Sequence, residues 1–165
     1  MTDIETITSQ NATYAENFAG KDLPPHPSKK IAVLACMDAR IMVNEALGLK
    51  IGEAHIIRNA GGIATDDVLR SLIISHELLG TEKIIIINHT ECGMATFKDE
   101  DLQKKLSDKY HSNASDIEFH SFDDLEENVK NQIKRIKSTP FLSNIISVNG
   151  FIYDIKTGKI REVLA

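Results

Sequence analysis

Short apolar segments recur along the chain and predict buried strands. Residues 31–35 and 84–87 are entirely apolar, and residues 54–58 and 145–148 are largely so. A central strand of a parallel sheet has such a run without polar alternation because helices cover both of its faces. We therefore expect these segments to pair within one sheet.

Amphipathic segments between the strands predict helices that cover the sheet. Residues 41–49 form a short helical stretch, residues 66–79 end at a glycine, and a third apolar stripe runs to residue 138 from about residue 122. Ser121 and Asp124 resemble a capping box for this third helix. Strands that alternate with helices indicate an α/β fold with a mostly parallel sheet and right-handed crossovers.

The last part of the chain predicts a hairpin at the edge of the sheet. Residues 151–155 and 160–163 are strand-like and flank a four-residue turn, and Gly150 separates the first of them from residues 145–148. The sheet should therefore have four to five strands. Residues 108–120 are polar without a clear period, so we expect a surface excursion there.

The amino-terminal part predicts a helical arm over residues 1–22. Its apolar residues at helical spacing are Ile4, Ile7, Tyr14 and Phe18. They favour an amphipathic helix at 3–19, which the proline-rich connection 23–30 separates from an α/β core at 31–165. The apolar stripe must be buried against something. Folding back on its own sheet and packing on a second subunit are both open.

Composition limits the class of partner. The chain has 165 residues, the length of a single domain, with a formal net charge of −5 and no tryptophan. Its lysines are interspersed with acidic residues, which argues against binding of nucleic acid through clustered positive charge. Apolar runs fall short of the roughly 18 residues that span a bilayer, and no secretory signal is present. We expect a cytoplasmic protein with a small-molecule substrate and no membrane or nucleic-acid partner.

Three residues with metal-binding side chains follow two of the predicted strands. His89 and Cys92 lie just after 84–87, and Cys36 follows 31–35. If these strands are parallel neighbours, the three side chains meet at one edge of the sheet, where α/β proteins place their chemistry. Three protein ligands and an open position are typical of catalytic zinc. The alternatives are two cysteines that pack as small apolar residues, or a disulfide between them.

A pair of glycines follows the predicted strand at 54–58. The stretch Asn59–Gly62 could form a phosphate cradle at the start of the next helix. It lacks the spacing of a dinucleotide fingerprint, and Asp66 and Asp67 would repel a phosphate there. We interpret these two aspartates as residues that begin the helix.

Taken together, the polar residues at the strand ends resemble a known family. The matching motifs are Cys36-x-Asp38-x-Arg40, Arg58-Asn59-Ala60-Gly61-Gly62 and His89-x-x-Cys92-Gly93. Their order and intervals resemble those of the β-class carbonic anhydrases, and Gly150–Asp154 with Thr157-Gly158 is similar to that family's closing segment. The resemblance covers about residues 29–163.

The resemblance implies a zinc enzyme that converts carbon dioxide and water to bicarbonate and a proton. It implies one zinc per chain with Cys36, His89 and Cys92 as ligands, and Asp38 and Arg40 as a catalytic dyad. Asn59, Ala60, Gly61, Gly62 and Gly93 are assigned to the substrate pocket and its backbone. The family forms homodimers or larger assemblies, including dimers of dimers, in which amino-terminal helices lie across the partner.

The chain departs from the family pattern at one position, and two alternative functions are open. Ala39 stands where the family often has serine. Hydrolases of carbonyl sulfide and carbon disulfide share the same ligand set, so the ligands alone do not determine the substrate. A non-catalytic, zinc-stabilised interaction domain would use Asp38 as a permanent fourth ligand. Whether Asp38 pairs with Arg40 or binds the metal is left open by the sequence.

Overall fold

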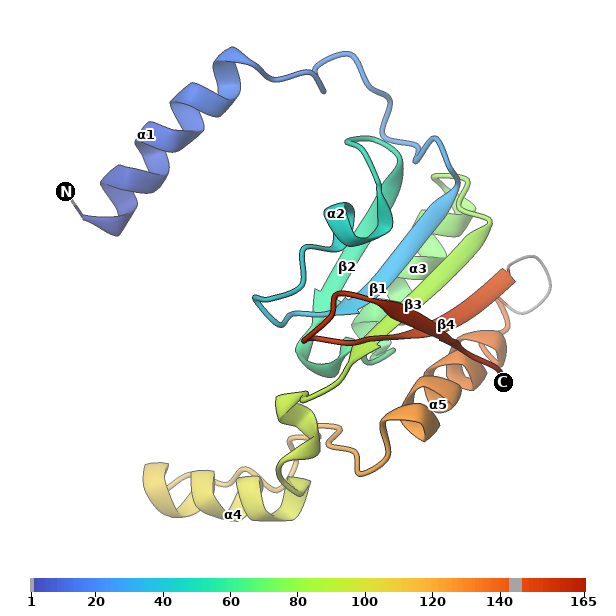
Figure 1. Cartoon of the computed structure of the whole chain (residues 1–165). Coiled ribbons are helices and arrows are strands. Elements are labelled where there is room, and N and C mark those ends of the chain that lie inside the picture. Colours follow the sequence, from blue (N-terminus) through green and yellow to red (C-terminus); the bar gives the residue numbers. More distant parts are fainter. Residues whose placement is uncertain (1, 143–146) are drawn as a thin grey trace.

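The fold is a five-stranded sheet with helices on both faces (Figure 1). The structure is a computed structural model that describes residues 2–142 and 147–165. Its strands are β1 (Ile31–Cys36), β2 (Ala54–Asn59), β3 (Lys83–His89), β4 (Ser147–Tyr153) and β5 (Ile160–Val163). Their order is β2-β1-β3-β4-β5, and only β5 runs antiparallel to its neighbour. The mostly parallel α/β sheet is confirmed.

Helices cover both faces of the central strands. The described helices are α1 (Asp3–Glu16), α2 (Val43–Leu47), α3 (Asp66–Glu77), α4 (Asp99–Tyr110) and α5 (Leu125–Lys137), of which α2, α3 and α5 cover the sheet. Apolar residues of α3 and α5 pack with Leu34 and Ile86 on one face of the sheet, while Val33 and Ile87 belong to a second core with α2. Neighbouring residues of β1 and β3 thus point into different cores. This explains why both strands are apolar throughout.

The strand near the carboxyl end differs from the expectation. Residues 145 and 146 of the expected strand lie outside the part that the structure describes, and β4 continues from Ser147 through Gly150 to Tyr153. The expected break at Gly150 is wrong. A Cβ atom there would lie 2.3 Å from Cγ1 of Val129 on α5, so the glycine allows the helix to approach the strand closely. The predicted hairpin is confirmed, because β4 and β5 pair antiparallel.

A helix that was not predicted from the sequence, α4, leads into the expected surface excursion at 108–120. Helix α4 has no buried residue, and it projects away from the sheet in Figure 1. A helix without a buried face leaves no apolar period to detect. The next helix, α5, begins later than expected, because Asp124 and not Ser121 is its N-cap. The side chain of Asp124 accepts a hydrogen bond from the Glu127 amide, 2.8 Å away.

Helix α1 stands apart from the rest of the chain (Figure 1). None of its residues is buried, and Ile4 and Ile7 are 72% and 64% exposed. It therefore does not fold back on its own sheet, which was one of the two packing alternatives. None of the described helices is both long and apolar enough to cross a membrane.

The carboxylate of Asp99 joins the start of α4 to the end of the surface excursion. It accepts hydrogen bonds from the backbone amides of Phe119, His120 and Ser121 at 2.7–2.9 Å. Partial burial alone would raise the pKa of Asp99, but the hydrogen bonds from Ser121, His120 and Phe119 lower it to about 2. A lowered folded-state pKa means that this stabilisation is complete above the ordinary aspartate pKa and is lost as the pH falls toward 2.

We predict that Asp99→Asn lowers the free energy of unfolding at pH 7 by about 1–3 kcal/mol, because an amide cannot accept from all three donors as a carboxylate does. The difference from the wild type should shrink as the pH falls from 4 toward 2. Urea denaturation at several pH values measures it. Asp101→Asn, an exposed position of the same helix, is the control. Equal losses in the two variants would contradict the role of Asp99.

Candidate metal centre and active site

The parallel pairing of β1 with β3 brings the predicted ligands together. Ala35 lies opposite Ile87 in the register, so Cys36 and His89 both emerge at the carboxyl edge of the sheet. Cys92 follows three residues later, at the start of a short 3₁₀ turn. The ligand atoms of Cys36, His89 and Cys92 all lie within 4.8 Å of one another, and all three residues are buried.

The imidazole of His89 is held in the tautomer that can bind a cation. Its Nδ1 lies 2.9 Å from the carbonyl oxygen of Thr90, and because a carbonyl can only accept, Nδ1 carries the proton and donates it. Its Nε2 then has a free lone pair. Within the described residues, this Nε2 is the one buried side-chain nitrogen or oxygen without a hydrogen-bond partner. Such an atom is costly to bury unless a ligand satisfies it, so the three residues fit a zinc ion.

The two cysteines share a proton in the absence of metal. A hydrogen bond from the Cys92 thiol, the largest effect, lowers the pKa of Cys36 to about 4, although burial acts in the opposite direction. The same hydrogen bond raises the pKa of Cys92. Backbone groups of Asp38 and Gly61 also favour the Cys36 thiolate, and the backbone of Met94 favours that of Cys92. These contacts favour ionisation of Cys36 over Cys92, and metal binding would displace the proton that remains.

The carboxylate of Asp38 is paired with Arg40. Its Oδ1 accepts hydrogen bonds from the Nε and the backbone amide of Arg40, both at 2.9 Å, and its Oδ2 accepts from Nη2 at 2.7 Å. These side-chain and backbone hydrogen bonds from Arg40 hold the pKa of Asp38 well below its usual range. Oδ2 of Asp38 also lies 3.7 Å from Nε2 of His89, so the carboxylate faces the ligand cluster. Of the two partners considered for Asp38, the structure has Arg40.

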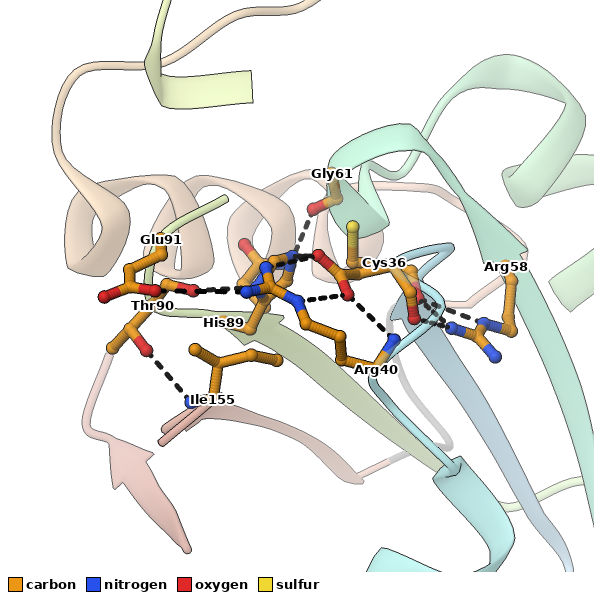
Figure 2. A network of polar contacts seen from close by, with 10 residues as sticks. Cys36, Arg40, Arg58, Gly61, His89, Thr90, Glu91 and Ile155 are labelled. Carbon is orange, nitrogen blue, oxygen red and sulfur yellow. Dashed lines mark hydrogen bonds and ion pairs between the residues drawn. The ribbon is translucent and has the colours of Figure 1, made fainter. Parts of the chain in front are cut away.

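Arg40 is also part of a chain of alternating charges at the mouth of the site. Its Nη1 lies 3.9 Å from Glu91, which pairs with Lys156 at 2.7 Å. Thr90 accepts a hydrogen bond from the Ile155 amide at 3.0 Å (Figure 2). The turn between His89 and Cys92 is therefore tied to the β4–β5 connection.

Arg58 fixes the backbone that carries the dyad. Its Nε and Nη2 donate to the carbonyl of Cys36 at 3.0 and 2.9 Å, and Nη2 also donates to the carbonyl of Asp38 at 2.7 Å (Figure 2). Arg58 belongs to one of the motifs found in the sequence, but no role was predicted for it. Its place in that motif, directly before Asn59, could have indicated that it belongs to the site.

The paired glycines allow a close approach of backbone to the metal ligands. Gly61 and Gly62 have φ of +81° and +62°, and a Cβ atom on Gly62 would lie 3.0 Å from the Cys36 nitrogen. Asn59 holds the turn through two hydrogen bonds with the backbone of Ile63 at 2.7 and 2.8 Å. The turn therefore packs directly against the candidate metal site.

A cavity of about 220 Å³ opens above the ligand cluster. It is lined by Cys36, Met37, Asp38, Ala60, Gly61, His89, Cys92, Gly93 and Met94. Seven of these residues were assigned to the site from the sequence, whereas Met37 and Met94 were not. Arg40, Asn59 and Gly62 do not line the cavity, but Arg40 pairs with Asp38, the Asn59 carbonyl accepts from the Met37 amide, and Gly62 lies against Cys36.

Comparison with known proteins agrees with this geometry. The family model described as carbonic anhydrase matches residues 31–160. The chain is 46% identical to β-carbonic anhydrase 1 of Mycobacterium tuberculosis over 163 residues, covering 99% of each protein. The chain belongs to the β-carbonic anhydrase family.

A solved structure and a second kind of relative extend the family comparison. A carbonic anhydrase from Streptococcus mutans superposes with a TM-score of 0.94 at 40% identity and covers 99% of both chains. A carbon disulfide hydrolase from Acidithiobacillus thiooxidans is 32% identical, and that match covers 81% of this chain and 77% of the hydrolase. Family members thus include enzymes named for two different substrates.

Proposed function

We propose that the protein is a carbonic anhydrase that converts carbon dioxide and water reversibly to bicarbonate and a proton. One Zn²⁺ per chain would be held by Cys36, His89 and Cys92. The observation that carries this proposal is the unpartnered Nε2 of His89 inside a buried Cys-His-Cys cluster. Zinc bound by three protein ligands lowers the pKa of a bound water and supplies a nucleophile near neutral pH.

Asp38 and Arg40 are the residues of this chain that would orient such a water. Asp38 stays ionised and can only accept a hydrogen bond, and Arg40 holds it from two sides in a fixed orientation. Oδ2 of Asp38 lies 3.7 Å from Nε2 of His89, so the carboxylate could accept a hydrogen bond from an O–H group held at the metal site and orient that oxygen toward the cavity. A cavity of about 220 Å³ suits a small, linear substrate. Because Asp38 is engaged by Arg40, the geometry favours a catalytic site over a closed structural one.

We predict that Asp38→Asn and Arg40→Ala each lower kcat/KM for carbon dioxide hydration by about 100-fold or more, the usual scale for a group that handles a reacting proton. Zinc content and fold should be retained, since neither residue is a proposed ligand. Stopped-flow hydration at pH 8 and metal analysis measure this. Asp108→Asn and Lys104→Ala break an exposed ion pair on α4 and are matched controls. Near-normal turnover in either dyad variant would remove the dyad from the mechanism.

Hydrolysis of carbonyl sulfide or carbon disulfide is the second candidate, since a carbon disulfide hydrolase is among the relatives. The higher identity and fuller coverage of the β-carbonic anhydrase support carbon dioxide as the substrate. Sulfide release by the same preparation should therefore be slow beside hydration. Faster turnover of either sulfur compound would assign the site to the second candidate.

We further propose a homodimer, or a dimer of dimers, in which α1 packs on a second copy of the chain. The exposed apolar stripe of α1, which contacts no core of its own chain, supports this assembly. A cytoplasmic location fits a metal site built from two free thiols, because the cytosol keeps thiols reduced.

We predict that Ile4→Asp with Ile7→Asp dissociates the assembly. Burying one isoleucine contributes about 1.5–3 kcal/mol, so each substitution should raise the dissociation constant roughly 10–100-fold at 1.4 kcal/mol per tenfold. Sedimentation of the full-length variants measures the mass. Ser9→Asp places the same charge on the polar side of α1 and serves as the control. An unchanged mass for the double variant would reject the helical arm.

A further inference from the structure

Helix α5 buries two amide side chains within its apolar face. Asn128 and Gln132 are each 7% exposed, beside the apolar Val129 and Ile133. A third amide, Asn88, is 1% exposed and directly precedes the proposed ligand His89. Buried amides are unfavourable unless their hydrogen bonds are satisfied. The hydrogen-bond partners of these three amides therefore indicate why amides occupy core positions that apolar residues could fill.

The three amides form a closed ring of hydrogen bonds with the glycine turn. Gln132 Nε2 donates to Asn128 Oδ1 at 2.8 Å, and Asn128 Nδ2 donates to Asn88 Oδ1 at 2.6 Å. Asn88 Nδ2 donates to the carbonyl of Gly61 at 2.9 Å. The backbone amide of Ala64 donates to Gln132 Oε1 at 2.9 Å and closes the ring. Two residues of α5 thus hold both ends of the turn at 61–64.

This turn lies against the proposed ligand Cys36. A Cβ atom on Gly62 would lie 2.8 Å from Asn88 Nδ2 and 3.0 Å from the Cys36 nitrogen, so the turn is wedged between Asn88 and the end of β1. Gly61 and Cys36 line the same cavity.

We propose that Asn128 and Gln132 are positioning residues for the metal centre. Through Asn88 they hold the turn at 61–64 where its backbone supports Cys36 as a ligand. Neither residue lines the cavity or offers an atom to the ligand cluster. The inference rests on the metal site of the proposed function, and it assigns to α5 the outer hydrogen bonds that orient ligands in metal sites.

Asn128→Leu and Gln132→Met in the full-length chain test the proposal, because both keep the approximate volume and remove the hydrogen bonds. We expect zinc affinity, measured by competition with a chromogenic chelator, to fall about 10–100-fold, the usual effect of losing an outer-shell partner. The thiolate-to-metal absorption band of the cobalt-substituted variants should also shift. A residue that only fills the core would change neither quantity.

Two variants of the same helix are matched controls. Val129→Ala removes buried apolar volume and should lower stability with wild-type zinc affinity, and Asn131→Leu alters an exposed amide. Wild-type affinity and an unchanged cobalt spectrum in both test variants would overturn the proposal while leaving the metal site intact. Absence of zinc binding by the wild type would overturn both. If Asn128→Leu does not fold, Gln132→Met decides, because it removes the hydrogen bond to the Ala64 amide and leaves the bond between Asn128 and Asn88 in place.

Discussion

The parallel pairing of β1 with β3 is the constraint on which the site depends. Both strands contribute to apolar cores on both faces of the sheet, so a slip of one residue would exchange the side chains that face each core. The fixed register places Cys36 and His89 at the same edge. The position of two proposed ligands therefore follows from the packing of isoleucines, valine and leucine several residues away.

Hydrogen bonds then set the orientation of each polar group at that edge. Thr90 selects the tautomer of His89, Arg58 holds the backbone around Cys36, and Arg40 holds Asp38. With so many partners satisfied, the unpartnered Nε2 of His89 stands out as a position for a cation. An unsatisfied buried polar atom costs about 1–3 kcal/mol, and metal binding would offset that cost. A site ordered in advance in this way needs little rearrangement during the reaction.

The sequence predicts the parts of this arrangement that depend on local pattern. The apolar runs at 31–35 and 84–87 indicated neighbouring buried strands, and the residues after them indicated a shared metal site. Helix α4 was missed because it buries no face. Gly150 was misinterpreted as a break between strands, because the residue that requires a glycine there is Val129 of α5, which is distant in the sequence. Hydrogen bonds that join distant segments leave no periodic signal. The role proposed for the amides of α5 depends on their hydrogen bonds to Asn88 and to the glycine turn, which only the structure shows.

X-ray absorption at the zinc edge of the purified protein tests the central claim most directly, because it reports the atoms around the metal. The account predicts about one zinc per chain, with two sulfur atoms at about 2.3 Å, one nitrogen at about 2.0–2.1 Å and one further light atom. Fewer than two sulfur neighbours, or no stoichiometric zinc, would contradict Cys36, His89 and Cys92 as the ligand set.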